Sequence, residues 1–265
     1  MSQPVQQMAT TSSREDDGGS AIRITGVSQR FASIAALEDV DIELAEHERL
    51  GLVGPSGCGK STLLSAVAGL IEPSLGAISI GGSTSARARL ARCALMPQRD
   101  LLLPWRTALD NCCLALENKG LSRAQSRETA RPLFERFGLA AFEEKLPAQL
   151  SGGMRQRVAF LRTLLAGKDV LLLDEPFGAL DSITRGQMQE WLLAALEQEP
   201  RTVLLVTHDV DEALLLSDHV VVMSARPGRV LRKLEARFPH DVPRREVVTS
   251  PEFVALKEQA LEALE

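Results

Sequence analysis

The feature that most constrains this chain is a glycine-rich run directly after an apolar segment. Residues 54–61 read Gly-Pro-Ser-Gly-Cys-Gly-Lys-Ser. They stand between the apolar residues 50–53 and a helical pattern over 61–70. The glycines let successive backbone N–H groups turn toward one anion, and the start of the helix adds the positive end of its dipole. The sequence therefore predicts an α/β protein with a phosphate-binding turn.

Four side chains, two in this turn and two after a later apolar run, suit a nucleotide and its metal. Lys60 supplies a point charge for the β- and γ-phosphates, and the Ser61 hydroxyl suits Mg²⁺, which prefers oxygen ligands. The apolar run 170–173 predicts a buried strand that ends on Asp174 and Glu175, where open α/β sheets place ligands. We expect Asp174 to hold Mg²⁺ through its water shell and Glu175 to act as general base. Taken alone, either motif can be purely structural.

Composition excludes several other classes of protein. The chain has 265 residues, of which 45% are hydrophobic and 25% charged, as in soluble globular proteins. Its apolar runs fall far short of the roughly 20 residues that span a bilayer. The net charge of −5 gives no global basic field, so we expect no nucleic-acid partner. The four cysteines show no metal-binding spacing, which favours a reducing cytoplasm.

The order of the remaining patterns predicts a parallel core with an insertion. Residues 1–20 are polar and are expected to form a disordered leader. Between about residues 100 and 165 the density of β-branched residues drops, and Ser122 with Gln125 forms a capping-box pattern. We expect an inserted helical subdomain there. Strand patterns and one helical pattern lie outside it, at 22–27, 40–44, 203–206 and 219–223 for the strands and 183–197 for the helix.

A further motif gives the chain a family resemblance. Residues 150–157 read Leu-Ser-Gly-Gly-Met-Arg-Gln-Arg, and a Ser-Gly-Gly turn before a helix is itself an anion site. This run resembles the signature of the ATP-binding cassette (ABC) superfamily. The turn at 54–61, Gln98, this run, the acidic pair, Asp181 and His208 stand in the order of that family. The resemblance covers roughly residues 21–240.

The resemblance implies a fold and a set of nucleotide-binding residues. The fold is a P-loop NTPase with a RecA-like core, an antiparallel β region and a helical subdomain at about 99–165, and a helical tail follows at 241–265. ATP and Mg²⁺ are the implied cofactors. The implied contacts to ATP are Phe31, Gly54, Pro55, Ser56, Gly57, Cys58, Gly59, Lys60, Ser61, Thr62, Ser151, Gly152, Gly153 and Asp181.

The resemblance also implies how the site works. Two copies would face each other head to tail, each ATP lying between the turn at 54–61 of one chain and Ser151–Gly153 of the other. Asp181 would cross this interface, or it would simply cap the next helix. His208 would contact the γ-phosphate and orient Glu175 and the water. Gln98 would reach both the attacking water and Mg²⁺, beside Ser61 and Asp174, and would hinge the helical subdomain to the core. Phe31 is expected to stack on adenine, with an ordinary strand-end role as the alternative.

The chain is most similar to importer-type cassettes. It has no fused membrane segment, no second cassette and no coiled coil, and residues 101–107, 178–182 and 224–229 resemble the group that takes up nitrate, sulfonates, taurine and thiamine precursors. This implies two membrane permease subunits, an extracytoplasmic solute-binding protein acting indirectly, and a place on the cytoplasmic face of the membrane. The substrate stays open. A soluble nucleotide switch and a P-loop kinase are the rival interpretations.

Two apolar patterns carry further expectations. Leu102, Leu103, Pro104 and Trp105 are expected to line a groove for a permease helix, with packing of the helical subdomain as the alternative. In the tail, Ser250 and Pro251 predict a helix start. The expected apolar stripe of that helix consists of Phe253, Leu256, Leu261 and Leu264.

Overall fold

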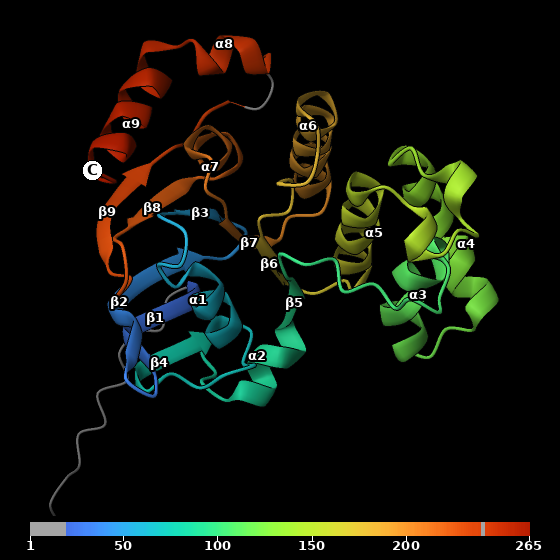
Figure 1. The fold of residues 1–265 in the computed structure, drawn as a ribbon, viewed down its shortest axis with the longest axis horizontal. Helices are drawn as coiled ribbons and strands as arrows, with labels where there is room; N and C mark the ends of the chain where they lie inside the picture. The colour runs from blue at the N-terminus through green and yellow to red at the C-terminus, as the bar shows by residue number, and fades with distance from the viewer. Residues whose placement is uncertain (1–19, 240–241) are drawn as a thin grey trace, which may run out of the picture.

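The computed structural model describes residues 20–239 and 242–265, and it contains two sheets (Figure 1). Apart from Ser20, the expected leader lies outside these residues. A six-stranded sheet has the order β5-β6-β7-β3-β8-β9, and a three-stranded sheet has the order β2-β1-β4. The large sheet contains β3 (Arg49–Val53), β5 (Cys93–Met96), β6 (Val170–Asp174), β7 (Thr202–Val206), β8 (His219–Met223) and β9 (Val230–Glu235).

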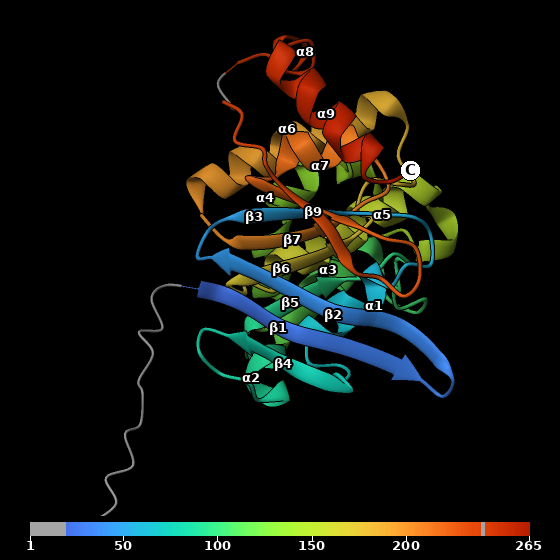
Figure 2. The ribbon, with the colours of Figure 1, turned by 90° about the vertical axis from the view of Figure 1, so that its left-hand side faces the viewer.

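The small sheet is the antiparallel β region (Figure 2). Its strands are β1 (Ser20–Phe31), β2 (Ile34–Ala45) and β4 (Leu75–Ile80). The patterns at 22–27 and 40–44 predicted strands correctly but underestimated their length. Register shifts in β1 between Ile24 and Gln29 explain the difference, because each shift interrupts the alternation of apolar and polar residues.

The large sheet is parallel from β5 through β8, with β9 added antiparallel at its edge. Every residue of β6 and β7 is buried, as expected for parallel strands that are covered on both faces. Alternate residues face different sides. Leu171 and Leu173 join one hydrophobic cluster, whereas Val170 and Leu172 join the other.

The helices form two groups around this sheet. In Figure 1, α3, α4 and α5 gather in a lobe on the right, while α8 and α9 lie beside α7 at the upper left. Short 3₁₀ turns at Ala140–Phe142 and Pro147–Gln149 connect α4 to α5. The α-helices are α1 (Lys60–Val67), α2 (Ala86–Arg92), α3 (Ala108–Asn118), α4 (Arg123–Arg136), α5 (Gly152–Leu165), α6 (Ser182–Gln198), α7 (Val210–Leu216), α8 (Arg244–Val248) and α9 (Pro251–Glu262).

The helical lobe occupies the segment where the sequence predicted helices. The predicted capping box starts α4: the backbone N–H of Gln125 donates to Ser122 Oγ, and the Gln125 side chain accepts from the Ser122 backbone. Phe134 is fully buried in the same cluster as one face of β6. The lobe therefore shares its core with the sheet.

The segment before α3 departs from the expected groove. Leu102 is buried in the core of the helical lobe, so the prediction that it lines an open groove is wrong. Its backbone N–H donates to the carboxylate of Asp100 at 3.2 Å. Trp105, by contrast, is 73% exposed. Packing explains Leu102, and it leaves Trp105 unexplained.

The tail helix begins as predicted, with Ser250 Oγ accepting from the N–H of Phe253. Phe253 is buried, and Leu256 and Leu264 pack against the core. Leu261 is 44% exposed, and Ala260 is buried in its place, so including Leu261 in the stripe was wrong. Spacings of three and four residues put 253, 256, 260 and 264 on one helical face, and residue 261 falls outside it.

All four cysteines are free and buried, and burial raises the pKa of the Cys93 thiol to about 12. Within the described residues, no helix is both long enough and apolar enough to cross a bilayer.

Gly76 provides a test of how closely the strands of the small sheet approach. Its φ is +82°, and an added Cβ would lie 2.4 Å from the carbonyl oxygen of Gly26. We expect Gly76→Ala to destabilise the fold by about 2 to 5 kcal/mol, from left-handed strain and overpacking together. Gly120→Ala is the matched control, because Gly120 has φ +95° with open space around it. Thermal unfolding of both variants measures the difference, and equal losses would contradict the steric argument.

Candidate functional site

Four neighbouring strands each deliver one part of the candidate site at their carboxyl ends. In the order of the sheet, β5 leads to Gln98, β6 to Asp174 and Glu175, β7 to His208, and β3 to the turn at 54–61. The carboxyl edge of a parallel sheet is where α/β proteins bind ligands. Residues that lie more than a hundred positions apart in the sequence therefore meet at one edge.

The glycine-rich turn wraps around the ammonium group of Lys60. Lys60 Nζ donates to the carbonyl oxygens of Gly54 at 2.7 Å and Pro55 at 3.0 Å. Gly59 has φ +108°, and a Cβ there would lie 2.7 Å from the carbonyl oxygen of Ala36. The side chain of Cys58 is buried in the core, and its Sγ also accepts from Lys60 Nζ, at 3.7 Å. The sequence folds this way because only glycine fits where the turn presses against β2.

Asp174 ends β6 beside the start of α1. Its carboxyl is buried, and this burial raises its pKa, which a hydrogen bond from Ser61 partly offsets. Glu175 also raises the pKa and Lys60 lowers it. A buried carboxylate next to a hydroxyl is a hard-oxygen donor set that fits Mg²⁺. Within the described residues, no group of three or more His, Cys, Asp and Glu side chains is arranged to hold a metal ion.

Glu175 has a strained backbone held by its neighbours. Its φ is +48°, a left-handed conformation that costs about 1–2 kcal/mol for a residue with a Cβ. Its N–H donates to Val206 O at 2.8 Å, and Gln156 Nε2 donates to its carbonyl at 3.3 Å. These contacts turn the carboxylate toward the cavity. There it accepts from Gln98 Nε2 at 3.1 Å and lies 3.3 Å from His208 Nδ1.

A cavity of about 490 Å³ lies over this carboxyl edge. It is lined by ten residues that the sequence singled out, among them Phe31, whose side chain is 48% exposed. The ten are Phe31, Ser56, Gly57, Gly59, Lys60, Ser61, Thr62, Gln98, Asp174 and Glu175. One cavity thus gathers a phosphate turn, a hydroxyl, two carboxylates and an aromatic ring.

The remaining predicted residues lie outside the lining of this cavity. Gly54, Pro55 and Cys58 form the inner side of the turn, and His208 reaches the site through Glu175. The signature and the Asp181 region also stand apart: Ser151 caps α5, accepting from Met154 N–H, and Asp181 caps α6, accepting from the N–H groups of Ile183 and Thr184. Asp181 is therefore a helix cap, a role that is compatible with the predicted one at a dimer interface.

Arg226 lines the cavity and was missed as a site residue. It lies in the turn after β8, and an added Cβ on Gly57 would be 3.7 Å from its guanidinium. The sequence shows an arginine in a proline-containing turn, which is common. Only the pairing of β8 with β3 places that turn next to residues 54–61, and this pairing could not be read from the sequence.

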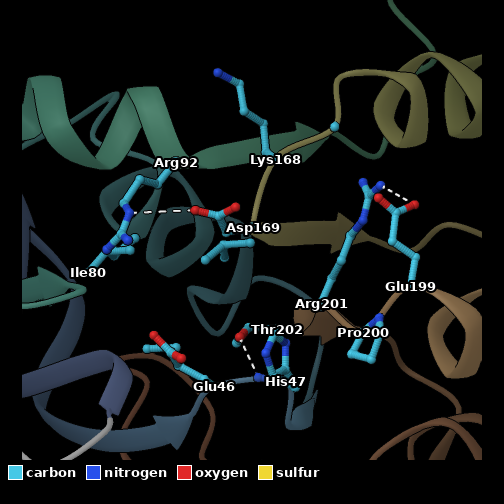
Figure 3. Close-up of a pocket in the computed structure, with 13 residues that line it drawn as sticks. Glu46, His47, Ile80, Arg92, Lys168, Asp169, Glu199, Pro200, Arg201 and Thr202 are labelled. Carbon is cyan, nitrogen blue, oxygen red and sulfur yellow. Dashed lines mark hydrogen bonds and ion pairs between the residues drawn. The ribbon is translucent and has the colours of Figure 1, made fainter.

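A second cavity, of about 220 Å³, lies at the amino edge of the same strands (Figure 3). Its cations are paired: Arg92 lies 3.6 Å from Asp169, and Arg201 lies 2.7 Å from Glu199. Lys168 donates to the carbonyl of Ala91. This cavity lacks a glycine-rich turn, so the cavity at the carboxyl edge is the candidate phosphate-binding site.

Arg226 provides a test of the cavity assignment. We expect Arg226→Ala to raise the KM for ATP by about three- to tenfold, because a cation next to the phosphate turn is lost. kcat should change less than KM. Steady-state ATPase assays measure both, with Arg229→Ala as the control from the same turn, since Arg229 pairs with Glu38. An unchanged KM would remove Arg226 from the site.

Comparison with known proteins places this geometry in a family. The ABC transporter family matches residues 37–178. The chain is 39% identical to the taurine import ATP-binding protein TauB of Yersinia pestis bv. Antiqua (strain Antiqua), over 91% of this chain and 95% of that protein. It is 45% identical to the aliphatic sulfonates import ATP-binding protein SsuB 1 of Rhodococcus jostii (strain RHA1), over 91% and 92%.

Solved structures agree with this result. A dimeric bacterial ABC transporter cassette is 30% identical, with a TM-score of 0.76 over 82% of this chain and 100% of that one. A post-hydrolysis cassette dimer bound to ADP and Pi is 29% identical, with a TM-score of 0.75 over the same shares. The family match spans more than half of the chain, and the curated relatives align over nine-tenths of it. This chain belongs to the ABC transporter family.

Proposed function

We propose that this chain binds and hydrolyses ATP as the cassette subunit of an importer, and that it does so as a homodimer. The observation that carries the proposal is the cavity over the carboxyl edge of the large sheet. It brings together the phosphate turn, Ser61, Asp174, Glu175 and Gln98, which are the groups that ATP hydrolysis requires.

The residues of the cavity divide the chemistry among themselves. Backbone N–H groups of residues 56–61 and the Lys60 ammonium hold the phosphates. Ser61, Asp174 and Gln98 would hold Mg²⁺, which neutralises charge on the phosphates when bound. Glu175 accepts a proton from the attacking water, and His208 and Gln98 fix the orientation of its carboxylate. Phe31, exposed at the rim, offers a face for adenine.

A second copy of the chain would complete the site. Ser151, Gly152, Gly153 and Asp181 are absent from the cavity lining, although Ser151 and Gly152 are exposed at the start of α5. A helix N-terminus of this kind suits the γ-phosphate of an ATP held by the partner. Two solved cassettes that are similar to this chain are described as dimeric, which supports the arrangement.

Transport would follow from docking to two permease subunits at the cytoplasmic face of a membrane. The relatives' names, for import of taurine and of aliphatic sulfonates, favour a small sulfonate among the candidate solutes. Nitrate and thiamine precursors are the alternatives. An extracytoplasmic solute-binding protein would act through the permease. Trp105, exposed on the helical lobe beside Leu103 and Pro104, is the proposed contact with the permease.

Glu175→Gln tests the catalytic assignment. The variant keeps the size of the side chain but removes the base, so turnover should fall about 10²-fold or more while ATP binding persists. ATP should also shift this variant to a dimer in size-exclusion chromatography, because bound ATP is no longer consumed. Lys60→Ala is the comparison and should lose tight ATP binding in a titration. Near-normal turnover of Glu175→Gln would rule out the assigned base.

Trp105→Ala tests the docking surface. Co-purification with the permease subunits from membranes should fall at least tenfold, as expected for a buried aromatic anchor at an interface. ATPase activity of the isolated cassette should stay within about twofold, because Trp105 lies outside the cavity. Leu231→Ala, which removes an exposed apolar side chain on β9, is the control. Equal effects of the two variants on association would contradict the proposed contact between Trp105 and the permease.

A further inference from the structure

A buried carboxyl lies behind the turn that carries His208, and none of the steps above uses it. Glu212 on α7 is 5% exposed, and burial raises its pKa. Its Oε2 accepts a hydrogen bond from the hydroxyl of Thr207 at 2.8 Å. No ion pair of Glu212 forms among the residues that the structure describes. Burying a carboxyl without an ion pair costs free energy of folding, so Glu212 adds little to stability by packing alone.

Glu212 closes a ring of hydrogen bonds around residue 208. Thr207 Oγ1 also accepts from the N–H of Asp209 at 3.1 Å, and Asp209 Oδ1 accepts from the N–H of Glu212 at 3.2 Å. These bonds fix the residues on both sides of His208. The side chain of His208 is 63% exposed and therefore has few packing contacts to orient it. Its direction toward Glu175 depends on the backbone of this turn.

We propose that Glu212 is a positioning residue for His208. Without the carboxyl, the Thr207 hydroxyl loses its acceptor, and the turn no longer holds the imidazole 3.3 Å from Glu175. This inference rests on the proposed role of His208 in catalysis. It extends that role to a part of the chain that lies outside the nucleotide cavity.

Steady-state ATPase kinetics provide the first test. Glu212→Ala should lower kcat about tenfold with the KM for ATP within twofold, and Glu212→Gln, which keeps an acceptor for Thr207, should recover most of the rate. In a His208→Ala background, Glu212→Ala should have less than about a twofold further effect, because its partner in the coupling is gone. The same fall in both backgrounds would overturn the proposal.

Histidine NMR gives a readout that does not depend on turnover. The chain has four histidines, His47, His208, His219 and His240, so their ring signals can be assigned by substitution. Glu212→Ala should shift or broaden the signal of His208 and leave His47 and His219 unchanged. If Glu212→Ala fails to fold, Thr207→Val removes the same hydrogen bond with little change in volume. An unchanged His208 signal in a folded variant would refute the positioning role.

Failure of this proposal can be distinguished from failure of the proposed function. Normal turnover of His208→Ala would overturn the proposed function. An unchanged kcat of Glu212→Ala beside a strongly reduced kcat of His208→Ala would overturn only the positioning role of Glu212.

Discussion

The adjacency of four parallel strand ends is the constraint on which the site depends. Because β5, β6, β7 and β3 lie side by side, Gln98, Glu175, His208 and Lys60 converge without any long side-chain network. β6 and β7 are buried on both faces, so their ends are held by the core and not by loops. The positions of the proposed catalytic groups are therefore set by sheet order.

The candidate site holds a small amount of backbone strain at Glu175, the proposed general base. The left-handed backbone of Glu175 is unfavourable by itself, and the hydrogen bonds with Val206 and Gln156 offset it. Gln156 belongs to α5, in the helical lobe, and Val206 belongs to β7. The conformation of Glu175 therefore depends on the contact between the lobe and the sheet. A rotation of the lobe would change the hydrogen bond from Gln156 and with it the backbone conformation of Glu175.

Much of the fold and the site could be predicted from the sequence, because the motifs carry their own local geometry. The turn at 54–61, the capping box at Ser122 and the apolar run before Asp174 each specify a structure within a few residues. Errors arose where tertiary packing decides. Leu102 is buried by the helical lobe, Leu261 falls outside the tail's contact face, and Arg226 reaches the cavity only through strand pairing. No local pattern encodes these contacts.

The alternation of side chains along β6 has a consequence for how this chain can vary. Val170 and Leu172 pack between the two sheets, while Leu171 and Leu173 pack toward the helical lobe. Alternate residues of one strand thus contribute to two hydrophobic clusters, one on each face of the sheet. Substitutions there can exchange one aliphatic group for another. An insertion or deletion of a single residue would instead move the side chains beyond it to the opposite face of the sheet. During evolution the length of this strand is expected to be far more restricted than its composition.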